Sequence, residues 1–188
     1  MKIIVITGST RGIGYGLAEA FLDLGCSVVI SGRNIDSVTE AVDKLARRFD
    51  RERVFGYACD VCQYEQVQAL WDSARQVFSK VDIWVNNAGI ANPLGSLLEQ
   101  PEETIRTVIN TNLTGAMYGA KVALHGMQPQ GYGAVYNLLG LGSDGRKQNG
   151  LLVYGTTKSA LRYFTDALAQ EVSGTGLLVG GVSPGMVV

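Results

Sequence analysis

The stretch KIIVITGSTRGIG, residues 2–14, decides the fold of this chain. Its first part, residues 2–7, is a short run of apolar, mostly β-branched side chains, which predicts a buried strand. A glycine-rich turn follows, and apolar residues then recur at helical spacing, which predicts a helix over 12–24. Strand, glycine-rich turn and helix in this order form a unit whose backbone N–H groups bind phosphate.

Three glycines in this turn have separate roles. Gly8 permits the tight turn, Gly12 lets the backbone approach a pyrophosphate, and Gly14 lets the helix pack close to the strand. Their spacing differs from the Gly-x-Gly-x-x-Gly pattern of many dinucleotide sites, and a plain strand-to-helix turn is the alternative. Because the flanking elements are right, we predict a dinucleotide site to which the turn contributes Gly8, Ser9, Thr10, Arg11, Gly12, Ile13 and Gly14.

The end of the second expected strand, 27–31, indicates which dinucleotide binds. A site that prefers NAD carries Asp or Glu there, to hold the ribose 2′-hydroxyl. This strand instead runs into SGRN, residues 31–34, without an acid. The Arg33 guanidinium suits a 2′-phosphate and Arg11 is a second candidate, which favours NADP(H). The alternative is that Arg33 is a solvated loop residue and the site does not distinguish the two cofactors.

A tyrosine and a lysine four residues apart, Tyr154 and Lys158, lie in an expected helix over 152–173. Residues at this spacing share one helical face, so the phenol and the ammonium can approach each other. A nearby ammonium favours the phenolate and lowers the pKa of the phenol from about 10. We therefore predict that Tyr154 is a general acid towards a carbonyl oxygen; an ordinary surface pair is the alternative for this spacing alone.

Strand and helix patterns alternate along the chain. The expected strands cover 2–7, 27–31, 53–58, 82–86, 133–138 and 177–182, and the expected helices cover 12–24, 35–48, 63–79, 102–127 and 152–173. This alternation predicts an α/β fold with a doubly wound parallel sheet, a Rossmann fold in three α/β/α layers, whose ligand lies at the carboxyl ends of the strands. The length suits a single domain over 1–188.

Taken together, these motifs resemble the short-chain dehydrogenase/reductase family from residue 2 to the C-terminus. The similarity rests on the glycine-rich turn and on Asp60-Val61, Asn86-Asn87-Ala88-Gly89, Asn112, Tyr154-x-x-x-Lys158 and Pro184-Gly185. The resemblance implies that Tyr154 is the acid/base, that Lys158 tunes it and holds the nicotinamide ribose, and that Asn112 anchors a water between the lysine and solvent. The cofactor-binding residues expected outside the turn are Arg33, Asn34, Asp60, Val61, Asn87, Ala88, Gly89, Tyr154, Lys158, Pro184 and Gly185.

One position departs from the family pattern. The family carries a catalytic serine after the fifth strand, where this chain reads NLLGLGS, residues 137–143, with Gly140 at the expected position. Ser143 is the nearest hydroxyl and could hold the substrate carbonyl if the loop folds back. Backbone N–H groups of residues 140–142 could also hold it, or Tyr154 could hold the oxygen alone.

The glycine-rich variant resembles the chlorophyll(ide) b reductase branch of the family, as do residues 58–62, 82–87 and 183–187. This resemblance implies NADPH-dependent reduction of a formyl group on a chlorin ring. Family members continue beyond the region of Pro184-Gly185 with a substrate-covering segment and a last strand, which we expect this chain to lack.

Composition bears on compartment and partners. A net charge of −1 gives no electrostatic reason to expect nucleic acid or an anionic membrane as partner. We find no apolar run long enough for a membrane span and no signal-peptide pattern, and three cysteines suit a reducing cytosol, so we expect a cytoplasmic protein. Cys59, Cys62 and the distant His125 do not make a four-ligand zinc site, and we expect no metal.

The sequence thus favours an NADPH-dependent oxidoreductase that transfers a hydride to an aldehyde or ketone, with NADP(H) as cofactor. The expected catalytic residues are Tyr154, Lys158, Asn112 and Ser143. One alternative is a 3-oxoacyl thioester, sugar or steroid as substrate of the same chemistry, and another is a non-catalytic NADP-sensing protein. The resemblance also implies that helices 102–127 and 152–173 pair with another subunit in a homodimer or homotetramer; ordinary packing on the sheet is the alternative.

Overall fold

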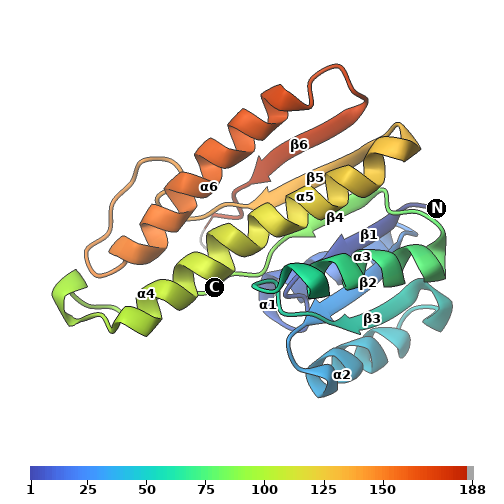
Figure 1. The fold of residues 1–188 in the computed structure, drawn as a ribbon. Coiled ribbons are helices and arrows are strands. Elements are labelled where there is room, and N and C mark those ends of the chain that lie inside the picture. Colours follow the sequence, from blue (N-terminus) through green and yellow to red (C-terminus); the bar gives the residue numbers. More distant parts are fainter. Residues whose placement is uncertain (186–188) are drawn as a thin grey trace.

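Six runs of apolar, β-branched residues form one parallel sheet in the computed structural model, which describes residues 1–185 (Figure 1). The strands are β1 (Ile3–Ile6), β2 (Ser27–Gly32), β3 (Val54–Ala58), β4 (Ile83–Asn86), β5 (Gly133–Leu138) and β6 (Leu177–Val182). They lie in the order β3-β2-β1-β4-β5-β6, and each neighbouring pair is parallel. The predicted doubly wound α/β fold is confirmed. In the segment 183–187, which the sequence comparison above used, residues 186 and 187 lie outside the part of the chain that the structure describes.

Helices cover both faces of this sheet. They are α1 (Gly12–Asp23), α2 (Ile35–Ala46), α3 (Tyr64–Phe78), α4 (Glu102–Ile109), α5 (Gly115–Met127) and α6 (Leu152–Glu171). Helices α1 and α2 share a core with one face of the sheet, whereas α3, α5 and α6 pack on the other face. Figure 1 shows these three helices on the same side. The chain therefore has the three layers predicted from its sequence.

Successive side chains of the central strand enter different cores. Ile4 and Ile6 of β1 pack in the core under α1 and α2, and Val5 packs in the core under α3 and α5; all three are fully buried. A strand buried on both faces has apolar residues at every position, which explains why the sequence shows a continuous apolar run there. Both cores hold the carboxyl ends of β1, β2 and β4 at one edge, where the site lies.

The expected helix over 102–127 differs in one detail. Its path is one long rod in Figure 1, but Asn110–Thr114, between α4 and α5, form a turn of π-helix. A π turn inserts an extra residue into the helical hydrogen-bond ladder, and such turns often occur at functional sites. Here the turn contains Asn112, which is almost completely buried.

Candidate functional site

The glycine-rich turn after β1 makes close contacts that only glycine permits. Gly8 has a left-handed backbone with φ +62°, and a Cβ on it would lie 2.8 Å from the Ala88 Cα. A Cβ on Gly14 would lie 2.4 Å from the Asn87 Nδ2 and 2.7 Å from the Gly8 carbonyl oxygen. Gly12, with φ +60°, has open space where its Cβ would be. The turn thus packs tightly on the segment after β4 and leaves room above Gly12 for a ligand.

Hydrogen bonds fix the turn against the segment that follows β4. The Asn87 Nδ2 donates to the carbonyl oxygens of Thr7 and Gly8, each at 2.8 Å. The Thr7 hydroxyl oxygen accepts from the backbone N–H groups of Asn87 at 3.0 Å and Ala88 at 3.1 Å. Because these four bonds are partly buried and converge on Thr7 and Asn87, they hold the turn in one shape.

A cavity of about 520 Å³ opens at this edge of the sheet. Its lining includes every residue predicted for the turn except Ser9, together with the predicted Arg33, Asn34, Asp60, Val61, Asn87, Ala88 and Gly89. It also includes five residues that were not predicted: Gly32, Ser37, Cys59, Ile90 and Thr111. Four of them are next in sequence to a predicted residue, Arg33, Asp60, Gly89 or Asn112. That position was the signal by which the sequence could have identified them. Ser37 carries no comparable signal.

The Ser9 side chain forms hydrogen bonds within the sheet and does not line the cavity. It is fully buried, its hydroxyl donates to the Ile6 carbonyl oxygen at 2.7 Å, and its oxygen accepts from the Ser31 N–H at 2.9 Å. These bonds join the ends of β1 and β2. The predicted cofactor contact of Ser9 stays a prediction.

Cationic and capping groups stand at the rim of the cavity after β2. The Asn34 Oδ1 accepts from the Ser37 N–H at 2.9 Å and caps the N-terminus of α2, which brings that helix end to the cavity. Arg33 and Arg11 also line the cavity and are exposed. Glycines and arginines in the lining fit the phosphate groups of a nicotinamide dinucleotide.

Helix α6 places the predicted acid and its lysine at the end of β5. Tyr154 is half-buried, and Lys158 is only 5 % exposed. The Lys158 Nζ donates to the Leu138 carbonyl oxygen at 2.8 Å and lies 5.7 Å from the centre of the Tyr154 ring. A Cβ on Gly89 would lie 3.7 Å from this Nζ. The lysine is therefore next to the wall of the dinucleotide cavity, as its predicted role requires.

The pKa of Tyr154 differs from the expectation. Burial raises the pKa of the phenol above its usual value of 10.0, and burial lowers the pKa of the Lys158 ammonium from 10.5 to about 8. The predicted lowering of the tyrosine pKa is not found because removal from water is the dominant effect on the phenol. The ammonium is bonded to the Leu138 oxygen rather than to the phenol. Tyr154 thus retains its proton at neutral pH.

Asn112 ties the segment after β4 to helix α6. Its Nδ2 donates to the Ile90 carbonyl oxygen at 2.8 Å and to the Thr157 hydroxyl at 3.1 Å, and its Oδ1 accepts from the Ile90 N–H at 2.8 Å. A Cβ on Gly89 would lie 3.4 Å from this Oδ1. Asn112 therefore positions both the cavity wall and the helix that carries Lys158. Its predicted contact with a water stays a prediction.

Ser143, Pro184 and Gly185 do not line the dinucleotide cavity. The Ser143 hydroxyl donates to the Gly140 carbonyl oxygen at 2.6 Å, and its N–H donates to the same oxygen at 3.0 Å. Its proton is thus used within its own turn, and a substrate would have to replace that bond. Pro184 and Gly185 are exposed just beyond β6 and do not line the described dinucleotide cavity. The roles of all three residues stay predictions.

A second, larger cavity of about 1200 Å³ lies beside the first turn of α6. It is lined by Leu94, Gly95, Ser96, Leu97, Leu141, Gly142, Gly145, Arg146, Lys147, Gln148, Asn149, Gly150, Leu151, Leu152, Gly155, Thr156 and Ser159. These residues come from the segments after β4 and β5 and from α6 itself. Its wall begins with Leu141, directly after Gly140, and includes Gly155, directly after Tyr154. Five leucines line the cavity, and its lining includes the sequence neighbours of Gly140 and Tyr154 but not these two residues themselves.

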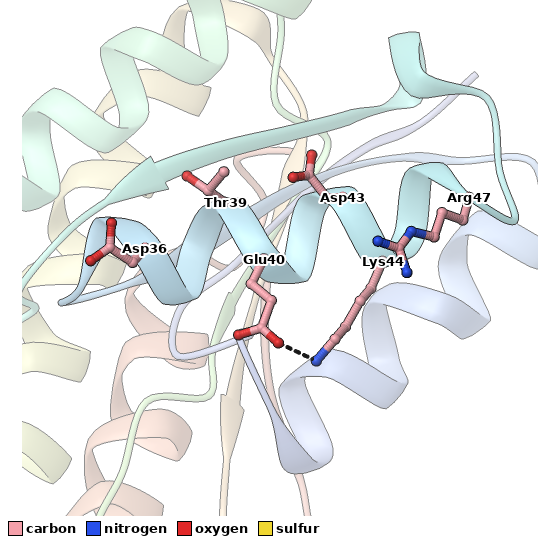
Figure 2. Close-up of a pocket in the computed structure, with 6 residues that line it drawn as sticks. All are labelled: Asp36, Thr39, Glu40, Asp43, Lys44 and Arg47. Carbon is pink, nitrogen blue, oxygen red and sulfur yellow. Dashed lines mark ion pairs between the residues drawn. The ribbon is translucent and has the colours of Figure 1, made fainter.

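Figure 2 shows a third hollow, along the exposed side of α2. All six residues that line it belong to that helix or its end: Asp36, Thr39, Glu40, Asp43, Lys44 and Arg47. Glu40 and Lys44 form an ion pair at 2.7 Å. Such i, i+4 pairs are ordinary on solvated helices. The dinucleotide cavity is the better candidate site.

Metal and membrane features were also sought in the described residues. No group of three or more His, Cys, Asp and Glu side chains there could hold a metal ion. None of the helices in residues 1–185 has the length and apolar character needed to cross a bilayer. Cys59 lies in the core beside the dinucleotide cavity, and burial raises the pKa of its thiol to about 12. It is therefore not a reactive thiolate at neutral pH.

Comparison with known proteins agrees with this geometry. The family model for short chain dehydrogenases matches residues 2–188. Chlorophyll(ide) b reductase NOL, chloroplastic, of Oryza sativa subsp. japonica is 40 % identical over 190 residues, which cover 98 % of this chain and 55 % of the relative. This chain thus spans about half the length of that relative.

Solved structures share the fold closely. The closed form of a serine dehydrogenase complexed with NADP+ has a TM-score of 0.90 and 28 % identity, over 99 % of this chain and 73 % of the other. A 3-ketoacyl-(acyl-carrier-protein) reductase from Brucella melitensis, complexed with NADH, has a TM-score of 0.90 and 26 % identity, over 97 % and 75 %. Similar folds therefore bind either nicotinamide cofactor.

Proposed function

The chain belongs to the short chain dehydrogenase family, and from this premise we propose that it reduces an aldehyde or ketone with NADPH. The single observation that carries the proposal is the place of Tyr154 and Lys158. The Lys158 Nζ lies 3.7 Å from where a Cβ on Gly89 would be, at the wall of the dinucleotide cavity, and Tyr154 directly precedes Gly155, which lines the larger cavity. A carbonyl between the two cavities would have a proton donor on one side and a hydride donor on the other.

The residues of the chain supply the proton and the charge. Bound NADPH supplies a hydride equivalent to the carbonyl carbon. Tyr154, whose pKa is raised by burial, holds its proton until the carbonyl oxygen gains electron density and then donates it. Lys158, whose pKa of about 8 leaves it largely charged at neutral pH, stabilises the phenolate that results. Asn112 positions the helix that carries Lys158 through its bond to Thr157.

The preference for NADPH rests on charge at the cavity rim. Arg33 follows β2 directly, and no acid stands in the SGRN segment to hold a ribose 2′-hydroxyl. A guanidinium can bind a phosphate through two parallel hydrogen bonds. Asn34 supports this arrangement because it caps α2 and so fixes the segment on which Arg33 lies.

The second cavity favours a bulky, apolar substrate. Its volume of about 1200 Å³ exceeds the roughly 300–1,000 Å³ of most small-molecule sites. Leu94, Leu97 and Leu152 line it and are 73 %, 46 % and 56 % exposed, so they gain burial when an apolar ligand covers them. These features support a formyl group on a large ring, as in a chlorin, over a short aldehyde. A 3-oxoacyl thioester, a sugar and a steroid are the other substrates to test.

Two further proposals concern partners and location. We propose a homodimer or homotetramer that pairs through α5 and α6, where Met117 and Tyr163 are 37 % and 79 % exposed. The cytoplasmic location stays a prediction, and the relative named above is a chloroplastic protein.

The test compares Tyr154→Phe with Tyr132→Phe, which removes an exposed hydroxyl outside α5 and α6 and outside both cavities. NADPH oxidation is followed against a chlorin formyl compound, a 3-oxoacyl thioester, a sugar, a steroid ketone and a short aldehyde. We expect turnover of the chlorin compound, a loss of about 10²–10⁴-fold in Tyr154→Phe, and no loss in the control variant. NADPH binding should be unchanged in both. Turnover that survives in Tyr154→Phe would contradict the proposed acid, and NADPH binding without turnover of any compound would favour a binding protein.

A further inference from the structure

Gly140 occupies the position after β5 where the resembling family carries a serine, and its surroundings explain the glycine. A Cβ on Gly140 would lie 2.5 Å from the Tyr154 hydroxyl oxygen, a separation that no real Cβ contact tolerates. The same Cβ would lie 3.4 Å from the Tyr154 Cζ and 3.6 Å from the Lys158 Cε, which are ordinary contacts. The phenol oxygen therefore occupies the space that a side chain at this position would fill.

The backbone does not require glycine there. The loop between β5 and α6 has three glycines with positive φ, Gly142 at +101°, Gly145 at +82° and Gly150 at +83°, and Gly140 is not among them. An L-residue can therefore adopt the local conformation without backbone strain. Space beside Tyr154, rather than the chain path, is what excludes a side chain.

We propose that Gly140 is a positioning residue for the proton donor: it lets the Tyr154 hydroxyl settle over the end of β5, so that a serine at this position would displace the donor instead of assisting it. This inference deepens the proposed function and rests on it. Two contacts support the arrangement. The Ser143 hydroxyl holds the Gly140 carbonyl oxygen at 2.6 Å, and the Lys158 Nζ holds the Leu138 carbonyl oxygen at 2.8 Å. The backbone below Tyr154 is thus fixed on both sides of Leu139.

The inference reverses an expectation from the family pattern. If the serine hydroxyl were simply missing, Gly140→Ser would restore a donor for the substrate oxygen and raise kcat. If the phenol needs the space, Gly140→Ser and Gly140→Ala would both lower kcat. A displacement of about 1 Å at a reacting group can cost about a hundredfold in rate. We therefore expect kcat to fall about ten- to a hundredfold in both variants, with the Kd for NADPH unchanged because Gly140 does not line the dinucleotide cavity.

Thermal stability tests the contact without any substrate. In the wild-type chain, Gly140→Ala should lower Tm by roughly 2–10 °C because its Cβ overlaps the phenol oxygen. In a Tyr154→Phe background that oxygen is gone and the next ring atom is 3.4 Å away, so the same change should leave Tm almost unaltered. Gly16→Ala is the matched control, because a Cβ on Gly16 in α1 meets nothing within 4 Å.

The outcomes separate this inference from the proposed function. Equal losses of Tm from Gly140→Ala in the two backgrounds would overturn the proposed contact, and so would a kcat in Gly140→Ser that equals or exceeds that of the wild type. The inference is supported if Gly140→Ala lowers Tm in the wild-type chain but not in the Tyr154→Phe variant, and if kcat is also lower. If the wild-type protein turns over no carbonyl compound, the proposed function fails and the positioning role fails with it. The Tm cycle then still reports whether the phenol excludes a side chain at Gly140.

Discussion

The buried ammonium of Lys158 should make the stability of the protein depend on pH in a defined direction. Lys158 is 5 % exposed, and burial lowers its pKa from 10.5 to about 8. Between these two pH values the unfolded chain binds more protons than the folded chain. The free energy of unfolding therefore rises with pH in this window, which is opposite to the effect of a lysine stabilised by a partner.

The size of the effect follows from the two pKa values. Their difference of about 2.5 corresponds to about 3 kcal/mol that the folded chain loses at neutral pH by keeping this charge out of water. Integration between about pH 7 and about pH 10 recovers about 2.5 kcal/mol of this. Tyr154, whose pKa burial raises above 10.0, is present in both proteins compared below, so its own titration is common to both.

The assay is urea unfolding of the wild type and of Lys158→Met at several pH values, without cofactor. Methionine has a similar length and no charge, so other titrations cancel when the two free energies are subtracted. We expect the wild type to gain about 2.5 kcal/mol relative to Lys158→Met between about pH 7 and about pH 10. Lys147→Met, which removes an exposed lysine, should show no such gain. Parallel pH profiles for wild type and Lys158→Met would refute the reasoning.

Two further predictions concern the cofactor rim and a buried polar chain. Arg33→Ala should raise the Kd for NADPH about tenfold or more and leave the Kd for NADH nearly unchanged, because a charge-assisted hydrogen bond contributes about 1.5–3 kcal/mol. Titration calorimetry with both cofactors measures the two Kd values. Equal changes in both would remove the argument that Arg33 binds the 2′-phosphate. Asn137→Ala should lower the free energy of unfolding by about 2–4 kcal/mol, because the fully buried Asn137 bonds to the Asn86 amide at 2.8 Å and to the Thr165 hydroxyl at 2.9 Å. Denaturant unfolding measures this free energy. A loss below about 1 kcal/mol would show that these buried hydrogen bonds are replaceable.

The fold could be predicted from the sequence because its central strands, such as β1 and β2, are buried on both faces. A run such as residues 2–7 has no polar face, so its apolar character is continuous and its limits are visible within a residue or so of Ile3–Ile6. The break between α4 and α5 was not predictable in the same way. Residues 110–114 fit an ordinary helix by composition, and the π turn follows from tertiary bonds such as those of Asn112 with Ile90.

The site was predictable where a motif requires a special backbone. Gly8 and Gly14 follow from the close approach of the turn to the segment after β4, which the structure shows directly. Properties set by packing were not predictable. The sequence places an ammonium four residues from a phenol, but it does not show that Tyr154 is half-buried or that Lys158 is bonded to Leu138. Those two facts reverse the expected direction of the tyrosine pKa.

The raised pKa of Tyr154 bears on the proposed reduction. A reductase needs an acid at the carbonyl oxygen, and a phenol whose pKa is raised by burial stays protonated at neutral pH. An alcohol dehydrogenase needs a phenolate at the same place, and burial of Tyr154 opposes that form. Since Gly140 has no hydroxyl and the Ser143 proton is held by the Gly140 carbonyl oxygen, Tyr154 is the side chain in this loop region with a proton to give. The protonated state of Tyr154 therefore agrees with the proposed reduction of a carbonyl.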